Sequence, residues 1–159
     1  MDKNVKIAKQ LVRIAKMLVS EDTSFNPSSS NAGDDIESMN TDEKIKLLKN
    51  NASPELLEKL AEDEDWEVRE TVARNPKTPV DILRKLALDE DEHVRQSVAI
   101  NPNTTADILK KQAEDEDWVA RETVARNPKT PVDILRKLAL DEDEHVSKAA
   151  EGALRKRGQ

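Results

Sequence analysis

Four acidic turns carry the side chains best suited to bind a ligand or a partner. They are Glu62 to Asp65, Asp89 to Glu92, Glu114 to Asp117 and Asp141 to Glu144. If these segments stack, sixteen carboxylates form one ridge, which would attract a basic partner or hold Ca²⁺ loosely. The possible partner-binding residues are Asp89, Glu90, Glu92, Asp115 and Glu116. The favoured alternative is helix capping, because Asp65, Asp91, Asp117 and Asp143 stand where N-caps are needed.

Two tryptophans, Trp66 and Trp118, occupy equivalent positions and are also possible partner-binding residues. The intervening segments carry Glu92 and Glu144 at that position, so we expect it to lie near solvent. A half-exposed indole is a favoured anchor for a protein partner. The alternative, which we favour, is that each ring covers the seam to the adjacent segment.

Basic pairs recur with the same period, at Arg84/Lys85, Lys110/Lys111 and Arg136/Lys137. A continuous basic stripe could follow the phosphates of a nucleic acid. However, an acid precedes each row by four residues, as in Asp81–Lys85, and Asp91–Arg95 and Asp117–Arg121 repeat this spacing. We therefore expect a self-paired, solvated face rather than a nucleic-acid-binding one.

Neither histidine indicates catalysis or metal binding. His93 and His145 are two segments apart, too far to share a metal ion. His93, Ser97 and Asp89 have the residue types of a hydrolase triad, but Ala149 stands in the matching segment where Ser97 stands. With no cysteine and no phosphate-binding glycine loop, we expect no enzyme activity, no catalytic residue, no metal and no cofactor.

Repeats position all of these residues. Residues 74–94 read RNPKTPVDILRKLALDEDEHV, and residues 126–146 read the same. The offset of 52 splits into units of 26, marked by Asn75-Pro76, Asn101-Pro102 and Asn127-Pro128. Such a period predicts an all-α solenoid, in which each unit buries its apolar side against its neighbours and encloses no pocket.

Each unit is expected to hold two helices. In the second unit, Thr78 is the predicted N-cap of a longer helix with Pro79 in its first turn. The acidic turn follows, then a short helix that Asn-Pro ends. The last unit lacks Asn-Pro, so its final helix is expected to run longer and to cap the stack.

Three domains are predicted along the chain. Residues 1–20 form a basic amphipathic helix, residues 21–40 a flexible acidic and Ser-rich linker, and residues 41–159 the repeat array. The basic residues of the first helix that could bind a partner are Lys6, Lys9, Arg13 and Lys16. That helix could associate with itself, bind a partner, dock on the acidic ridge, lie on a membrane surface or be a leader.

Composition limits the partners further. The net charge is −7, so neither nucleic acid nor an anionic membrane is an expected partner. No apolar run approaches the roughly 20 residues of a membrane span, and lysines interrupt the apolar stretches of residues 1–20. The expected compartment is the cytoplasm.

The repeat pattern resembles the leucine-rich repeat variant (LRV) family over roughly residues 50–150. The residues that carry the resemblance are Val68, Arg69, Val72, Ala73, Asn75, Pro76, Thr78, Pro79, Leu83, Leu86, Ala87 and Asp89. The resemblance implies a right-handed superhelix of alternating longer and short helices, the short ones α or 3₁₀, and no catalytic residues. Gln112, Thr105 and Ala120 depart from the pattern, so the third unit is expected to pack less tightly.

The sequence therefore predicts a non-catalytic scaffold that binds another protein of unknown identity, through the array, the N-terminal helix or both. A nucleic-acid-binding repeat is one alternative. A structural assembly component is the other, since the string LVRIAKMLVS resembles leader-like segments of tailed-phage virion proteins.

Overall fold

The computed structural model describes residues 34–50 and 52–158, and every regular element within them is an α-helix. The predicted all-α class is confirmed. The predicted helix of residues 1–20, with Lys6, Lys9, Arg13 and Lys16, lies outside the described residues. The chain divides into two compact units, Met1–Val72 and Ala73–Gln159, each of which is described by itself.

In chain order the helices are α2 (Asp34–Glu37), α3 (Thr41–Asn50), α4 (Pro54–Leu60), α5 (Trp66–Arg74), α6 (Val80–Leu86), α7 (Glu92–Ile100), α8 (Ala106–Gln112), α9 (Trp118–Arg126), α10 (Val132–Leu138) and α11 (Glu144–Lys156).

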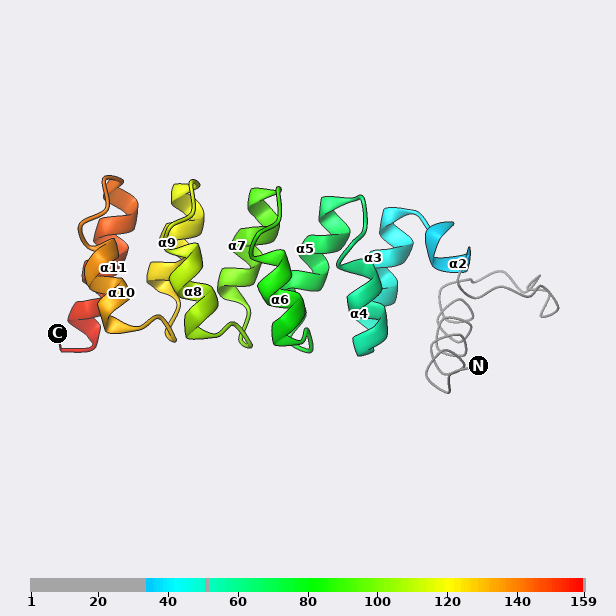
Figure 1. Ribbon diagram of the computed structural model, residues 1–159, viewed down its shortest axis with the longest axis horizontal. Coiled ribbons are helices and arrows are strands. Elements are labelled where there is room, and N and C mark those ends of the chain that lie inside the picture. The colour runs from blue at the N-terminus through cyan, green and yellow to red at the C-terminus, as the bar shows by residue number, and fades with distance from the viewer. Residues whose placement is uncertain (1–33, 51, 159) are drawn as a thin grey trace. The chain divides into compact units, whose positions relative to one another are not determined.

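Helices of successive repeats stack in the unit Ala73–Gln159. α7 packs against α9 and α9 against α11, while α6, α8 and α10 form a second row (Figure 1). The turns at residues 88–92, 114–117 and 140–144 lie along one edge, here called the acidic edge. The Asn-Pro turns lie along the opposite edge (Figure 1). This arrangement confirms the predicted helical stacking, and the right-handed twist stays a prediction.

The core of this unit is aliphatic, as predicted. Leu83, Leu109 and Leu135, one from each repeat, are completely buried. Val94 and Val146, at equivalent positions of α7 and α11, are completely buried as well. Leucine, isoleucine, valine and alanine fill the narrow space between stacked helices, so the core needs no aromatic ring.

A ladder of asparagines holds the turns of the Asn-Pro edge together. The Asn101 amide nitrogen donates hydrogen bonds to the backbone carbonyls of Ala73 (2.6 Å) and Asn75 (2.9 Å), one repeat earlier. Asn127 repeats the first of these bonds with the carbonyl of Ala99. Because a buried carbonyl without a partner is unfavourable, each asparagine stabilises the turn of the preceding repeat as well as its own.

Arg157 ends the ladder where a further Asn-Pro turn would follow. Its guanidinium donates to the carbonyls of Thr130 (2.6 Å) and Pro128 (2.7 Å). It reaches them because α11 runs for 13 residues, whereas α7 and α9 each end after nine. The predicted extension of the final helix is confirmed.

Two details of the predicted repeat were wrong. The helix expected to be the longer, α6, has seven residues, and the helix expected to be short, α7, has nine. α6 is short because it begins only after its N-cap, Pro79, and ends at Leu86, where Ala87 is the C-cap and the acidic turn follows. Thr78 is not the N-cap; it is completely buried. In the next repeat the equivalent Thr104 donates its hydroxyl to the carbonyl of Val98.

The unit Met1–Val72 contains a short helix within the segment predicted to be a linker. Residues 34–37 form α2, and Ile36 is 6% exposed, so ordered helical structure begins before residue 41. α3 is capped by Asn40 rather than Thr41: the Glu43 N–H donates to Asn40 Oδ1 (3.0 Å), and the Asn40 N–H donates to Glu43 Oε2 (3.0 Å). Residues 21–33 lie outside the described residues.

Candidate protein-binding surface

Each aspartate of the acidic edge accepts a hydrogen bond within the protein. Asp115 accepts the Asp117 N–H through Oδ1 (2.9 Å) and the Arg95 Nε–H through Oδ2 (2.8 Å). The two ion-paired side chains are only 7% and 10% exposed. Arg95 also donates to the carbonyls of Asp89 (2.9 Å) and Glu90 (3.0 Å) in its own turn. Asp115 therefore ties one repeat to the next and is not open to a partner.

The same arrangement recurs one repeat later. Arg121 donates through Nε to Asp141 Oδ2 (2.8 Å) and through Nη2 to Asp141 Oδ1 (2.9 Å). Hydrogen bonding to this guanidinium lowers the pKa of Asp141, and the carboxylate raises the pKa of Arg121. The predicted pairs Asp91–Arg95 and Asp117–Arg121 were wrong, because each arginine instead reaches the carboxylate 20 residues ahead in the next repeat.

A second set of aspartates caps helices, as predicted. Asp91, Asp117 and Asp143 accept hydrogen bonds from backbone N–H groups in the first turns of α7, α9 and α11. Asp65 accepts the Glu67 N–H and the Thr41 hydroxyl, and these hydrogen bonds lower the pKa of Asp65. Capping is therefore an established role of this second aspartate in each turn.

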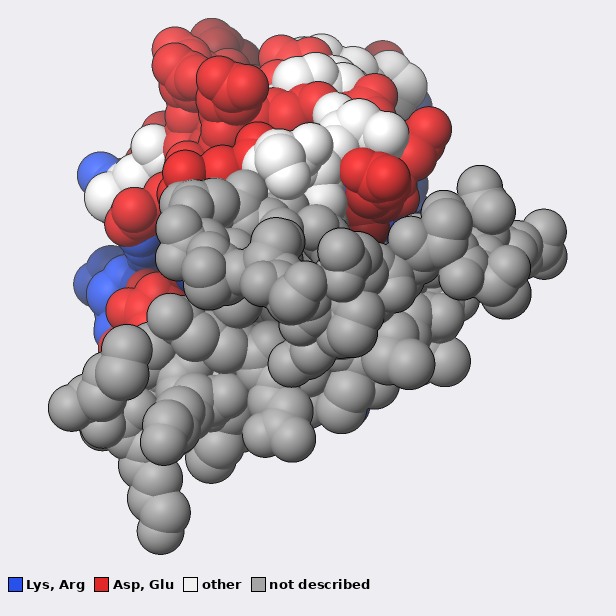
Figure 2. Space-filling model, turned by 90° about the vertical axis from the view of Figure 1, so that its right-hand side faces the viewer, with Lys and Arg blue, Asp and Glu red and all other residues white. Residues whose placement is uncertain are grey.

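The glutamates of the edge remain open to solvent. Glu90, Glu92, Glu116 and Glu142 are exposed, whereas Asp89 is half-buried and accepts the Asp91 N–H (2.9 Å). Figure 2, which views the molecule from the right-hand side of Figure 1, shows Asp and Glu side chains gathered in the upper part of that face. Within residues 34–50 and 52–158, no three His, Asp or Glu side chains gather to hold a metal ion.

Trp118 is the large side chain on this edge. Its indole is 40% exposed, as its replacement by glutamate in other repeats predicts, and its ring lies 5.0 Å from that of His145 at a tilt of 32°. His145 belongs to the next repeat, so the indole covers that seam and still presents a face to solvent. Trp66, in the other unit, is 37% exposed.

Carboxylates of neighbouring repeats compensate the basic rows. Arg84 binds Asp81 (2.8 Å) and, one repeat away, Asp107 (3.2 Å). Hydrogen bonding to Asp107 raises the pKa of Arg84. Lys137 binds Glu114 (2.6 Å), one repeat back, and this contact lowers the pKa of Glu114. Carboxylates therefore compensate Arg84 and Lys137, but the predicted pair Asp133–Lys137 was wrong, because Lys137 reaches Glu114 of the preceding repeat instead.

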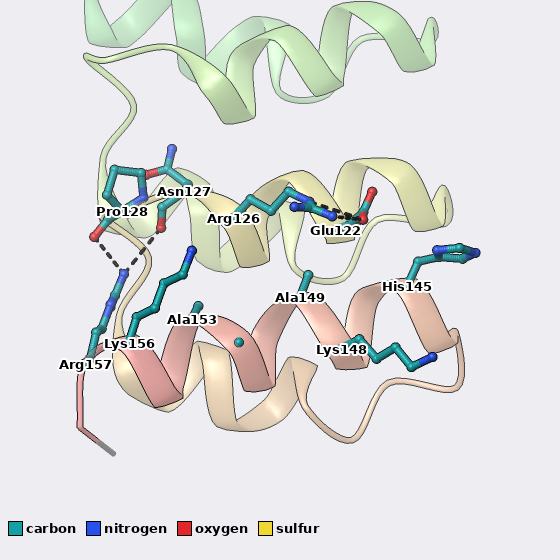
Figure 3. Close-up of a pocket in the computed structure, with 11 residues that line it drawn as sticks. Glu122, Arg126, Asn127, Pro128, His145, Lys148, Ala149, Ala153, Lys156 and Arg157 are labelled. Carbon is teal, nitrogen blue, oxygen red and sulfur yellow. Dashed lines mark hydrogen bonds and ion pairs between the residues drawn. The ribbon is translucent and has the colours of Figure 1, made fainter.

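A groove between α9 and α11 was not foreseen. It encloses about 700 Å³ and lies on the surface of these two helices (Figure 3). Small residues, Ala149, Gly152 and Ala153, lie on its α11 side. The available signal was the run of small residues after Val146, which replaces the Thr, Arg and Asn of the preceding repeat.

Comparison with known families identifies the repeats. The profile of the family described as "Leucine rich repeat variant" matches residues 66–91 and 118–143, so each matched segment begins at one of the two tryptophans. These two segments are LRV repeats. The LRV resemblance of the sequence is thereby confirmed, and the LRV repeats account for the all-helical stack.

Other comparisons add little to the LRV assignment. A crystal structure of an engineered protein is similar at 21% identity with a TM-score of 0.47, covering 96% of this chain and 81% of that one. No curated protein matches the sequence. Across residues 34–50 and 52–158, none of the helices has the length and apolar character to cross a bilayer.

Proposed function

We propose that this LRV protein is a non-catalytic scaffold that binds a basic segment of another protein at its acidic edge. LRV repeats are commonly protein-interaction scaffolds. The observation that carries the proposal is the indole of Trp118, which stays 40% exposed beside the glutamates of the edge.

The edge suits a basic, partly apolar partner. Glu116 lies two residues before Trp118, and its side chain is 91% exposed. Tryptophan contributes a large apolar area with little conformational freedom to lose, and its contact with His145 restrains it further before binding. Exposed glutamates around such an anchor speed the encounter with a cationic segment and select against acidic ones.

The two alternatives have less support. A nucleic-acid-binding face needs uncompensated cations, whereas Arg84 and Lys137 both bind carboxylates of neighbouring repeats. An assembly role would rest on residues 1–20, which lie outside the described residues. A mobility-shift assay at low salt tests the first alternative, and oligomer size after deletion of residues 1–20 tests the second.

The direct test uses a defined probe and a substitution that the repeat already tolerates. The probe is a peptide of residues 1–20, which has a net charge of +4, and its control has Lys6, Lys9 and Lys16 replaced by Glu. Binding to a protein that starts at residue 34 is followed by Trp118 fluorescence in a Trp66→Phe background.

We expect the basic peptide to change the emission and to lose its effect as salt rises. The Trp118→Glu variant, examined by calorimetry, should bind it more weakly while remaining folded, because Glu92 and Glu144 occupy the equivalent position. Equal binding of the basic and charge-reversed peptides, or binding of neither at millimolar concentration, would refute the proposal.

A further inference from the structure

The groove between α9 and α11 is created by a change in the repeat at its last unit. Residue Gly152 stands 26 positions after Arg126, and Ala149 stands 26 positions after Thr123. The side chains of Thr123 and Arg126 on α9 are thus replaced by smaller ones on α11. The result is the groove of about 700 Å³ that Figure 3 shows between the two helices.

Gly152 is not required by the packing of the protein itself. A Cβ atom built at this position meets no atom within 4 Å. Glycine inside a helix is unfavourable because it leaves the backbone more freedom in the unfolded chain. Its presence in the middle of α11 therefore leaves open space in the groove and stabilises nothing inside the fold.

One end of the groove is cationic. Lys156 and Arg157 line the end at which α9 and α11 both finish, whereas the side chain of Arg126 extends along the groove toward Glu122 (Figure 3). Arg157 is bound to turn carbonyls and Arg126 to Glu122 (2.7 Å), whereas Lys156 has no bonded partner within the described residues. At the other end Lys148 is paired with Glu144, so the surplus of positive charge lies near the helix C-termini.

We propose that this groove binds an amphipathic helix of a partner protein, antiparallel to α11, with acidic residues in its first turn. In that orientation the acidic turn meets Lys156. The positive end of the partner's helix dipole also meets the negative ends of α9 and α11. Ala149, Gly152 and Ala153 let the two backbones approach closely, as small side chains do between packed helices.

This site goes beyond the basic-segment binding proposed above. It has the opposite charge preference, and its cationic end lies at the Asn-Pro edge. Residues 1–20 do not suit that end, because their net charge is +4. Failure of one site leaves the other standing, because each is tested with a different peptide.

The test is calorimetric titration of the full chain with a synthetic helix that has Glu in its first turn, Ala and Leu three and four residues apart, and Lys in its last turn. The control peptide has Gln in place of the first-turn Glu. We expect the control peptide to bind the wild-type protein at least about tenfold more weakly than the acidic peptide does. The acidic peptide should likewise bind the Lys156→Glu variant at least about tenfold more weakly than it binds the wild type.

Gly152→Leu is the decisive variant. Since a side chain at this position meets open space, the variant should melt at an equal or higher temperature and yet bind the peptide at least about tenfold more weakly. Glu151→Leu is the matched control: it adds the same side chain at an exposed position outside the groove and should bind like the wild type.

Orientation has its own readout, because the chain has no cysteine. A nitroxide on a cysteine introduced at Arg155 should broaden the NMR signals of the first turn of the peptide more than those of its last turn. Undiminished binding to Gly152→Leu, no preference for the acidic peptide, or stronger broadening of the last turn would overturn the proposal.

Discussion

Replacing Gln112 with leucine should make the protein more stable. Gln112 is 1% exposed at a core position that leucine occupies in the other repeats, namely Leu60, Leu86 and Leu138. Its Nε2 donates to the carbonyl of Arg95 (2.6 Å), but its Oε1 is buried without a hydrogen-bond partner. At this position the third repeat therefore buries an unsatisfied polar atom, whereas the other repeats bury leucine.

The size of the change in unfolding free energy follows from three contributions, of which two favour leucine and one favours glutamine. A buried acceptor without a partner costs about 1–3 kcal/mol, and the single hydrogen bond to Arg95 contributes about 1 kcal/mol. Leucine has a similar size and adds apolar burial, since each buried methylene is worth about 0.8 kcal/mol. We therefore expect Gln112→Leu to raise the free energy of unfolding by about 1–3 kcal/mol.

Urea unfolding followed by circular dichroism measures this change. The midpoint should rise without a change in the slope, which reports the surface exposed on unfolding. The reverse substitution, Leu138→Gln, is the matched control, because the carbonyl of Arg121 lies 17 residues before it, as Arg95 lies before Gln112. We expect it to lower the midpoint by a comparable amount.

The refuting result is equally clear. If Gln112→Leu left the midpoint unchanged or lowered it, Oε1 would have a partner, such as a buried water molecule. The reasoning from an unsatisfied acceptor would then be wrong.

Three further predictions concern the contacts between repeats. Arg121→Gln should lower the free energy of unfolding, measured in urea, by about 2–3 kcal/mol, because it leaves the nearly buried carboxylate of Asp141 without its charge-assisted hydrogen bonds. A loss below about 0.5 kcal/mol would mean that the pair contributes no more than a surface ion pair. Arg121 lowers the pKa of Asp141 below its value in the unfolded chain, so the stabilisation from this pair is present above about pH 4 and is lost as the pH falls. The urea midpoint of the wild type should therefore decline more steeply with acidification than that of Arg121→Gln. Parallel declines of the two midpoints would contradict this. Asn101→Ala should lower the free energy of unfolding by about 3 kcal/mol, since it removes three hydrogen bonds at a site that is 1% exposed. Asn103→Ala removes hydrogen bonds from an exposed side chain and should lower it by about 1 kcal/mol or less. Equal melting temperatures of the two variants would argue against an asparagine ladder.

Local signals in the sequence predicted much of the repeat correctly. Asp91, Asp117 and Asp143 cap helices because an N-cap needs only a short acceptor and a free N–H one turn ahead. The exposed position of Trp118 followed from the glutamates that replace it in other repeats. Both inferences depend on neighbours within a few residues, or on comparison of one repeat with another.

Predictions failed where two repeats compete for the same side chain. Arg95 was expected to pair four residues back with Asp91, but packing places the carboxylate of Asp115 against it. A nearly buried bidentate pair is stronger than an exposed one within a helix, so the contact between repeats prevails. Asp115 thus binds Arg95 within the protein, and the site that we propose uses Trp118 and the exposed glutamates instead.

The sequence alone determined the period, the turns, the aliphatic composition of the core and the aspartate caps, because each of these depends on residues adjacent in the chain or on comparison of one repeat with the next. Tertiary structure decided which carboxylates pair between repeats, where the asparagines reach, and that α9 and α11 leave a groove between them. The reason is distance along the chain: these contacts join residues about 20 to 30 positions apart, and only the stacking of one repeat on the next brings them together.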